Sequence, residues 1–164
     1  MQVDEAPGFE RKIVARHALA RAALALPRPI VFTNGVFDIL HRGHVTYLAD
    51  ARSLGASLVV ALNSDDSVRR LAKGPDRPIN PLSDRLALVA ALESVSLACA
   101  FDEDTPLALI MALRPDVLVK GGDWPVQRIV GASEMADWGG TVHSIPFRFE
   151  RSTTSLLERI RANC

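Results

Sequence analysis

Two histidines three positions apart are the residues in this 164-residue sequence whose type and spacing best suit chemistry. His41 and His44 follow a short apolar run and an Asn34-Gly35 turn, and Gly43 lies between them. If a helix begins here, the spacing places both imidazoles on one face, and the helix N-terminus adds backbone N–H groups and a positive dipole. A glycine leaves room for a phosphate beside the backbone. The segment predicts an anion site with two imidazole donors; the alternative is two surface histidines near a turn.

The sequence carries neither of the two commonest nucleotide-binding motifs. It contains no G-x-G-x-x-G and no G-K-[ST], so a dinucleotide fingerprint and a P-loop are both absent. A phosphate site in this chain must therefore be built locally, from the histidine segment and from nearby cations.

A glycine- and proline-rich segment, residues 63–81, supplies such cations. It carries Lys73 and Arg77, and Arg85 begins the helix expected after it. A cation on a loop of this kind can close over phosphate groups. From the residues alone, a solvated loop charge competes with this interpretation for Lys73, and a surface helix charge competes with it for Arg85.

Two further segments combine small residues with polar ones. Residues 120–124 read Lys-Gly-Gly-Asp-Trp and follow an apolar run, and their glycines permit close approach of a ligand to the backbone. Trp124 either stacks on a base or packs against the protein. Residues 152–154, Ser-Thr-Thr, suit the N-cap and first turn of a helix, which is a plain cap or a second anion site.

The pattern of apolar residues predicts the strands and helices that position these segments. We expect strands at 30–33, 58–62, 95–101, 116–120 and 141–145, and helices at 9–26, 44–53, 84–93, from about 106, at 126–137 and at 152–162. Strands that alternate with helices indicate βαβ units. The predicted fold is α/β: a Rossmann-like, doubly wound, five-stranded parallel sheet with helices on both faces. Ligands bind such sheets beyond the carboxyl ends of the strands, where the candidate residues lie.

Two smaller expectations concern single side chains near these segments. Asp38 is expected to orient its loop rather than to touch substrate. Phe32, Phe37, Phe101 and Phe147 are expected in the core.

Composition excludes several classes of protein. Nineteen Lys and Arg balance nineteen Asp and Glu, so the chain has no basic field and nucleic acid is not an expected partner. No apolar run is long enough to span a bilayer, and the N-terminus does not resemble a secretory signal. Two cysteines are too few for a disulfide scaffold. We expect one domain in the cytoplasm, with an N-terminal helix in residues 1–28. The apolar face of this helix is a candidate interface for a homodimer or a higher homo-oligomer.

The motifs resemble those of the H-x-G-H nucleotidyltransferase superfamily, whose signature here reads His41-Arg42-Gly43-His44. Further blocks are similar to the heptose 1-phosphate adenylyltransferase subfamily, which is often fused behind a sugar kinase: residues 63–68, 77–78, 103–106, 115–123, 129–132, 139–140 and 152–154. The resemblance covers residues 30–160, and it implies that residues 29–164 form a nucleotidyltransferase domain.

The resemblance implies transfer of AMP from ATP to D-glycero-β-D-manno-heptose 1-phosphate, which gives ADP-heptose and pyrophosphate for lipopolysaccharide core biosynthesis. It implies that Mg²⁺ is held mainly by the nucleotide phosphates, without a dedicated protein metal site. Catalytic roles fall to His41, His44 and Lys73, and substrate phosphate binding to Arg77 and Arg85. Nucleotide-binding roles fall to Thr33, Asn34, Gly35, Phe37, Gly43, Lys120, Gly121, Gly122, Asp123, Trp124, Ser152, Thr153 and Thr154.

The sequence departs from the subfamily pattern at two places, and two other functions stay open. Ala72 separates Leu71 from Lys73, and Glu150 stands where relatives tend to have glycine. One alternative is a cytidylyltransferase acting on a small alcohol phosphate, because the same motifs would serve it. The other is a nucleotide-binding regulator without turnover.

Overall fold

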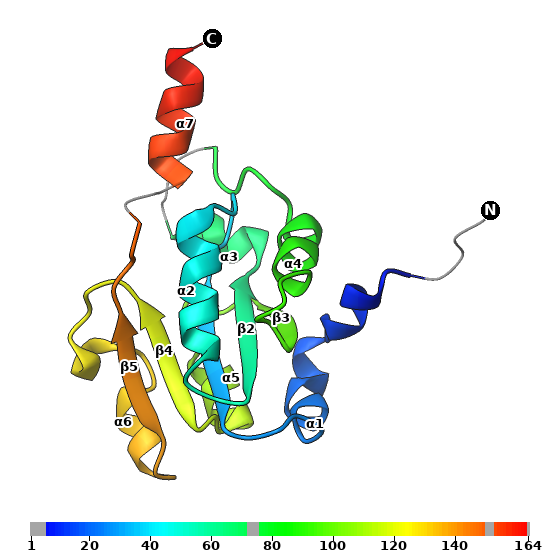
Figure 1. The fold of residues 1–164 in the computed structure, drawn as a ribbon, viewed down its shortest axis with the longest axis vertical. Coiled ribbons are helices and arrows are strands. Elements are labelled where there is room, and N and C mark those ends of the chain that lie inside the picture. The colour runs from blue at the N-terminus through cyan, green and yellow to red at the C-terminus, as the bar shows by residue number, and fades with distance from the viewer. Residues whose placement is uncertain (1–5, 72–75, 150–152, 164) are drawn as a thin grey trace.

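A five-stranded, all-parallel sheet forms the centre of the molecule, in the order β3-β2-β1-β4-β5 (Figure 1). The computed structural model describes residues 6–71, 76–149 and 153–163. The strands are β1 (Ile30–Gly35), β2 (Ser57–Asn63), β3 (Leu97–Phe101), β4 (Val117–Gly121) and β5 (Thr141–Ile145). Each neighbouring pair is parallel, so the predicted fold class is confirmed.

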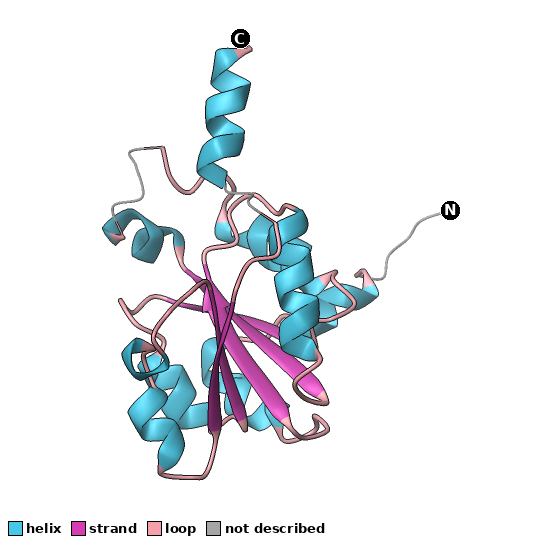
Figure 2. Cartoon of the chain, turned by 60° about the vertical axis from the view of Figure 1, so that its left-hand side comes forward, coloured by secondary structure: helices cyan, strands magenta, loops and turns pink. Residues whose placement is uncertain are grey.

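Helices cover both faces of the sheet (Figure 2). The α-helices in the described part of the chain are α1 (Leu19–Ala23), α2 (Arg42–Arg52), α3 (Asp65–Arg70), α4 (Leu82–Ala90), α5 (Leu107–Leu113), α6 (Ala132–Ala136) and α7 (Thr153–Ala162), of which α7 stands clear of the sheet. Successive strand residues point to opposite faces, and the core divides accordingly. Val31 packs in one cluster with Leu48 of α2 and Val89 of α4. Its neighbour Phe32 packs in the other cluster, with Ile110 of α5.

The N-terminal segment differs from the single helix expected over residues 9–26. It forms two 3₁₀ turns, η1 (Gly8–Lys12) and η2 (Arg16–Ala18), followed by the short α1. Between the turns, Ile13 pairs with Ala98 in a parallel bridge, and the Val14 N–H donates to the Ala98 carbonyl at 2.9 Å. Strand β3 lies at the edge of the sheet, so the N–H and C=O groups on its outer side have no strand to pair with and are free to bond to another segment. This pairing interrupts the helical pattern that the sequence displays.

Two other segments also differ from expectation. The region expected to be loop over residues 63–81 contains α3, and the Ser64 side chain caps it by accepting a hydrogen bond from the Ser67 N–H at 3.0 Å. The helix expected over residues 126–137 divides into the 3₁₀ turn η3 (Val126–Arg128) and α6. Gly131 separates them with φ 92°, a conformation that favours glycine and ends a right-handed helix.

The topology opens a crevice where the strand order reverses. Strands β1 and β4 are neighbours, and the connections that leave them lead to opposite faces of the sheet. Ligands bind doubly wound sheets at such a switch point, beyond the carboxyl ends of the strands. Figure 1 shows α7 beyond this same edge. Among the described helices, none combines the length and the apolar character needed to cross a membrane.

Candidate active site

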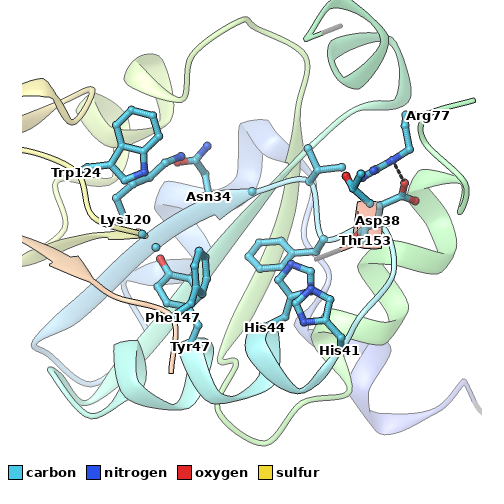
Figure 3. A pocket seen from close by; sticks show the side chains of 16 residues that line it. Asn34, Asp38, His41, His44, Tyr47, Arg77, Lys120, Trp124, Phe147 and Thr153 are labelled. Atoms are coloured by element: carbon cyan, nitrogen blue, oxygen red, sulfur yellow. Dashed lines mark hydrogen bonds and ion pairs between the residues drawn. The ribbon is translucent and has the colours of Figure 1, made fainter. Parts of the chain in front are cut away.

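A cavity of about 650 Å³ lies at the switch point between β1 and β4 (Figure 3). Side chains and backbone from both strand ends and from the N-termini of α2 and α7 form its walls. The lining residues are Asn34, Gly35, Val36, Phe37, Asp38, His41, His44, Tyr47, Arg77, Lys120, Gly121, Gly122, Trp124, Phe147, Thr153 and Thr154. Most of the residues that the sequence singled out therefore meet in one place.

The two histidines are stacked at the start of α2. His41 occupies the N-cap position with an extended backbone, at φ −142° and ψ 171°, and α2 begins at the next residue. The two ring centroids lie 3.8 Å apart with 20° between the ring planes. Phe37 contacts His44 edge-on, with ring centroids 5.3 Å apart. The pair thus presents two imidazoles beside the N–H groups of a helix N-terminus, an arrangement that favours phosphate.

Gly43 supports this pair in a different way from the one expected. It is buried and does not line the cavity. A Cβ at this position would lie 3.0 Å from two ring atoms of His41, Cε1 and Nδ1. The absence of a side chain at position 43 therefore makes room for the His41 imidazole, rather than for a ligand.

Asp38 holds the far wall of the cavity together. Its buried carboxylate accepts hydrogen bonds from the Ile79 and Asn80 N–H groups at 2.9 Å, and pairs with the Arg77 guanidinium. These contacts agree with the expectation that Asp38 orients its loop, although Asp38 also lines the cavity. Figure 3 shows this ion pair at the cavity, where Arg77 is part of the lining.

Arg85 lies outside the cavity, contrary to its predicted contact with substrate phosphate. Its side chain is 0% exposed. The guanidinium donates to the Val36 carbonyl at 2.8 Å and to the Asn80 carbonyl at 3.1 Å, and pairs with Asp65 at 2.6 Å. The charge and the N–H groups of a buried arginine need partners inside the protein, and these three groups provide them. The structure therefore gives Arg85 a structural role.

The end of β4 forms the opposite wall. Lys120, Gly121, Gly122 and Trp124 all line the cavity. Gly122 has φ 106°, which favours glycine, and the exposed Trp124 follows with its backbone N–H bonded to the Ser144 hydroxyl at 3.0 Å. Asp123, a predicted nucleotide contact, is exposed and does not line the cavity.

Two aromatic residues that line the cavity, Phe147 and Tyr47, were not among the site residues predicted from the sequence. Phe147 was expected in the core, yet it is 48% exposed and lines the cavity, with its ring centroid 5.6 Å from that of Tyr47. A Cβ on Gly121 would lie 2.7 Å from the Phe147 ring. Phe147 follows β5 by two residues, so its place after a strand end was the available signal.

Tyr47 explains the position of Thr33. The two hydroxyls lie 2.6 Å apart, and both side chains are buried. Thr33 does not line the cavity, although it was a predicted nucleotide contact; it supports the tyrosine instead. Burial raises the pKa of Tyr47 well above its usual range, so the phenol stays protonated at neutral pH.

The remaining predicted residues divide between the cavity and the undescribed segments. Thr153 and Thr154, at the N-terminus of α7, line the cavity. Lys73 and Ser152 lie outside the described residues, so their predicted roles stay predictions. Within residues 6–71, 76–149 and 153–163, no group of three or more His, Cys, Asp or Glu side chains could hold a metal ion.

A parallel doubly wound sheet with a histidine pair at its switch point is the arrangement expected of a nucleotidyltransferase, and the comparison with protein families agrees. The chain belongs to the cytidylyltransferase-like family, whose model matches residues 32–159.

Similarity to individual named proteins is more specific than the family match. The chain is 59% identical to a D-β-D-heptose 1-phosphate adenylyltransferase of Bordetella bronchiseptica, over 93% of this chain and 96% of that protein. It is 55% identical to the bifunctional protein HldE of Alcanivorax borkumensis, over 80% of this chain but only 28% of that longer protein.

Solved structures share the fold. A lipopolysaccharide core biosynthesis protein of Thermoplasma volcanium superposes with a TM-score of 0.60 at 31% identity, over 74% of this chain and 98% of that one. A pantothenate synthetase of Thermus thermophilus gives a TM-score of 0.57 at 20% identity, over 82% of this chain and 61% of that one, a likeness of fold alone.

Proposed function

We propose that this protein is an adenylyltransferase that transfers AMP from ATP to D-glycero-β-D-manno-heptose 1-phosphate, for lipopolysaccharide core biosynthesis in the cytoplasm. The observation that carries the proposal is the 59% identity to a heptose 1-phosphate adenylyltransferase over almost the full length of both proteins. The cavity supports it, because stacked imidazoles and two helix N-termini are suited to a triphosphate.

The reaction needs alignment more than proton transfer. An oxygen of the sugar phosphate attacks the α-phosphorus of ATP, a new P–O bond forms, and the bond to the β-phosphate breaks with its electron pair leaving on pyrophosphate. The attacking phosphate is already ionised at neutral pH, so no strong general base is required. Positioning and fixed hydrogen-bond donors dominate such transfers.

We propose that His41, His44 and the N–H groups at the start of α2 donate hydrogen bonds to the phosphate oxygens; both histidines line the cavity at that helix N-terminus, which supports the proposal. Thr153 and Thr154 offer hydroxyls and N–H groups from a second helix N-terminus. Mg²⁺ held by the nucleotide phosphates and water would neutralise part of the triphosphate charge. We propose that Lys73 adds a further positive charge and that Gly121 and Gly122 border the nucleotide.

A panel of nucleoside triphosphates and acceptors tests this proposal. With saturating heptose 1-phosphate, pyrophosphate release should favour ATP over CTP by at least about 10-fold in kcat/KM, or roughly 1.4 kcal/mol. The reason is that backbone groups which read adenine would be left unsatisfied by cytosine, at about 1–3 kcal/mol each.

Other outcomes of the panel point to the alternatives. Equal use of CTP, or turnover only with a small alcohol phosphate, would replace the adenylyltransferase assignment with a cytidylyltransferase. Nucleotide binding without pyrophosphate release for any acceptor would indicate a regulator.

A further inference from the structure

A second cavity of about 180 Å³ adjoins the first and shares three of its residues, Asn34, Lys120 and Trp124. Its remaining lining comes from the residue before α5, from β4, and from the end of η3 with the two residues after it: Pro106, Leu118, Val119, Arg128, Ile129 and Val130. Nothing in the sequence analysis pointed to Arg128.

The position of Arg128 is set by its neighbours. The Arg128 N–H donates to the Pro125 carbonyl at 2.8 Å, which closes the turn of η3. The next residue, Ile129, is buried in the core cluster that contains Ile110 and Leu118. The exposed Arg128 side chain therefore rises from an anchored turn at the cavity wall. In the part of the chain that the structure describes, no carboxylate pairs with its guanidinium.

The two cavities offer different chemistry to the two substrates. The larger one holds the imidazole pair, the threonines of α7 and the aromatic side chains of Tyr47 and Phe147, which suit a triphosphate and a flat base. The smaller one brings the cations Lys120 and Arg128 to an otherwise largely apolar wall. A neutral base has no charge for two cations to balance, whereas a sugar phosphate carries two negative charges near neutral pH.

The lining of the smaller cavity also suits a sugar. A pyranose ring presents C–H groups on its faces and hydroxyls around its rim. Ile129, Val130 and the indole of Trp124 offer apolar surface to such a face, and the Asn34 amide and Arg128 offer hydrogen bonds to the rim. Figure 3 shows Trp124, Lys120 and Asn34 together at the end of the site away from His41 and His44. An acceptor bound there would lie across the site from the imidazoles.

We propose that this second cavity is the acceptor subsite, which binds the sugar 1-phosphate, and that Arg128 determines acceptor affinity. The inference rests on the proposed function, because it assigns one of the two substrates of that reaction. Lys120 and Trp124 form the shared wall between acceptor and nucleotide.

Substitution of Arg128 tests the subsite. Arg128→Gln should raise KM for heptose 1-phosphate by about 10-fold or more, because a charge-assisted hydrogen bond is lost, while KM for ATP stays within about twofold. Arg128→Lys should recover part of the acceptor affinity because the charge is kept. Arg21→Gln is the matched control, because this exposed arginine of α1 lines neither cavity. Calorimetric titration of each variant with heptose 1-phosphate measures acceptor binding without turnover.

The outcomes separate the subsite from the function. An active enzyme whose Arg128→Gln variant keeps the wild-type KM for the acceptor overturns the subsite alone. A variant that loses affinity for ATP instead places the nucleotide in this cavity and also overturns it. Wild-type binding of heptose 1-phosphate that depends on Arg128 but gives no pyrophosphate supports the subsite and overturns the proposed function. A wild-type chain that neither binds nor converts the sugar overturns both.

Discussion

The imidazoles of His41 and His44 are held by packing as much as by their place on α2. Their rings stack on each other, Phe37 contacts one of them edge-on, and Gly43 leaves space for the other. A donor that is fixed before the reaction costs no reorganisation as charge develops on a phosphate. The pair is thus suited to stabilising the transition state more than to binding ground-state ATP.

Replacement of one imidazole tests this difference. His44→Ala should lower kcat by about 10²–10³-fold, equal to roughly 2.7–4 kcal/mol, because one aimed donor is removed. The Kd for ATP should change far less, since the other donors remain. Pyrophosphate-release kinetics and calorimetry measure the two quantities. His143→Ala, on the exposed edge of β5, is the control and should behave as wild type. A kcat within about threefold of wild type for His44→Ala would show that the transition-state role is wrong.

At the scale of elements, a buried ionic network ties the helices to the cavity wall. Arg85 of α4 reaches Asp65 of α3 and the Val36 carbonyl just after β1. Asp38 binds the segment before α4 through the Ile79 and Asn80 N–H groups. These contacts join elements far apart in sequence and hold the backbone that carries the cavity residues Val36 and Asp38.

Removal of Arg85 should therefore cost stability. Arg85→Ala leaves Asp65 and two carbonyls without their partner, and we expect the free energy of unfolding to fall by about 3–5 kcal/mol. Urea denaturation measures this change. Arg69→Ala, which breaks only the exposed pair with Asp66, should cost less than about 1 kcal/mol. If Arg85→Ala instead kept its stability and raised KM for a substrate, the phosphate-binding role predicted from the sequence would be right after all.

At the scale of the whole molecule, the core holds groups that ionise only at a cost. Cys99 on β3 is fully buried, and burial raises the pKa of its thiol from the usual 9.0 to about 12. The unfolded chain therefore loses this proton near pH 9, and the folded chain loses it near pH 12. Between these values the unfolded state binds fewer protons, so stability falls as the pH rises.

The pH dependence of unfolding checks this balance. Between pH 8 and pH 10, the Cys99 thiol should lower the free energy of unfolding by about 1.4 kcal/mol. Urea denaturation of Cys99→Ala at both pH values should show a decrease smaller by that amount. Tyr47, whose pKa is also raised by burial, contributes equally to both proteins. An identical decrease in the two proteins would mean that the thiol ionises as readily in the fold as outside it.

Local patterns in the sequence were enough to predict the fold class and the histidine segment of the candidate site. Apolar runs such as 58–62 are buried on both faces of a parallel sheet, and the residues after β1 and β4 meet because parallel strands end at one edge. The His41–Gly43–His44 segment could be predicted at a helix start because its spacing and its place after a strand are local properties.

Only the tertiary structure decided which side chains line the cavity. Arg85 looks like a surface charge on its helix, but Asp65 and the Val36 carbonyl satisfy it in the interior. Phe147 resembles a core residue, but it ends beside Tyr47 at the open edge of the sheet. The residues around Ile13 have a helical pattern, but Ile13 pairs with the edge of β3 instead. Arg128 and Lys120 line the same cavity only because the fold brings them there. Each outcome depends on contacts between residues distant in sequence, and the free energy of those contacts outweighs local preference.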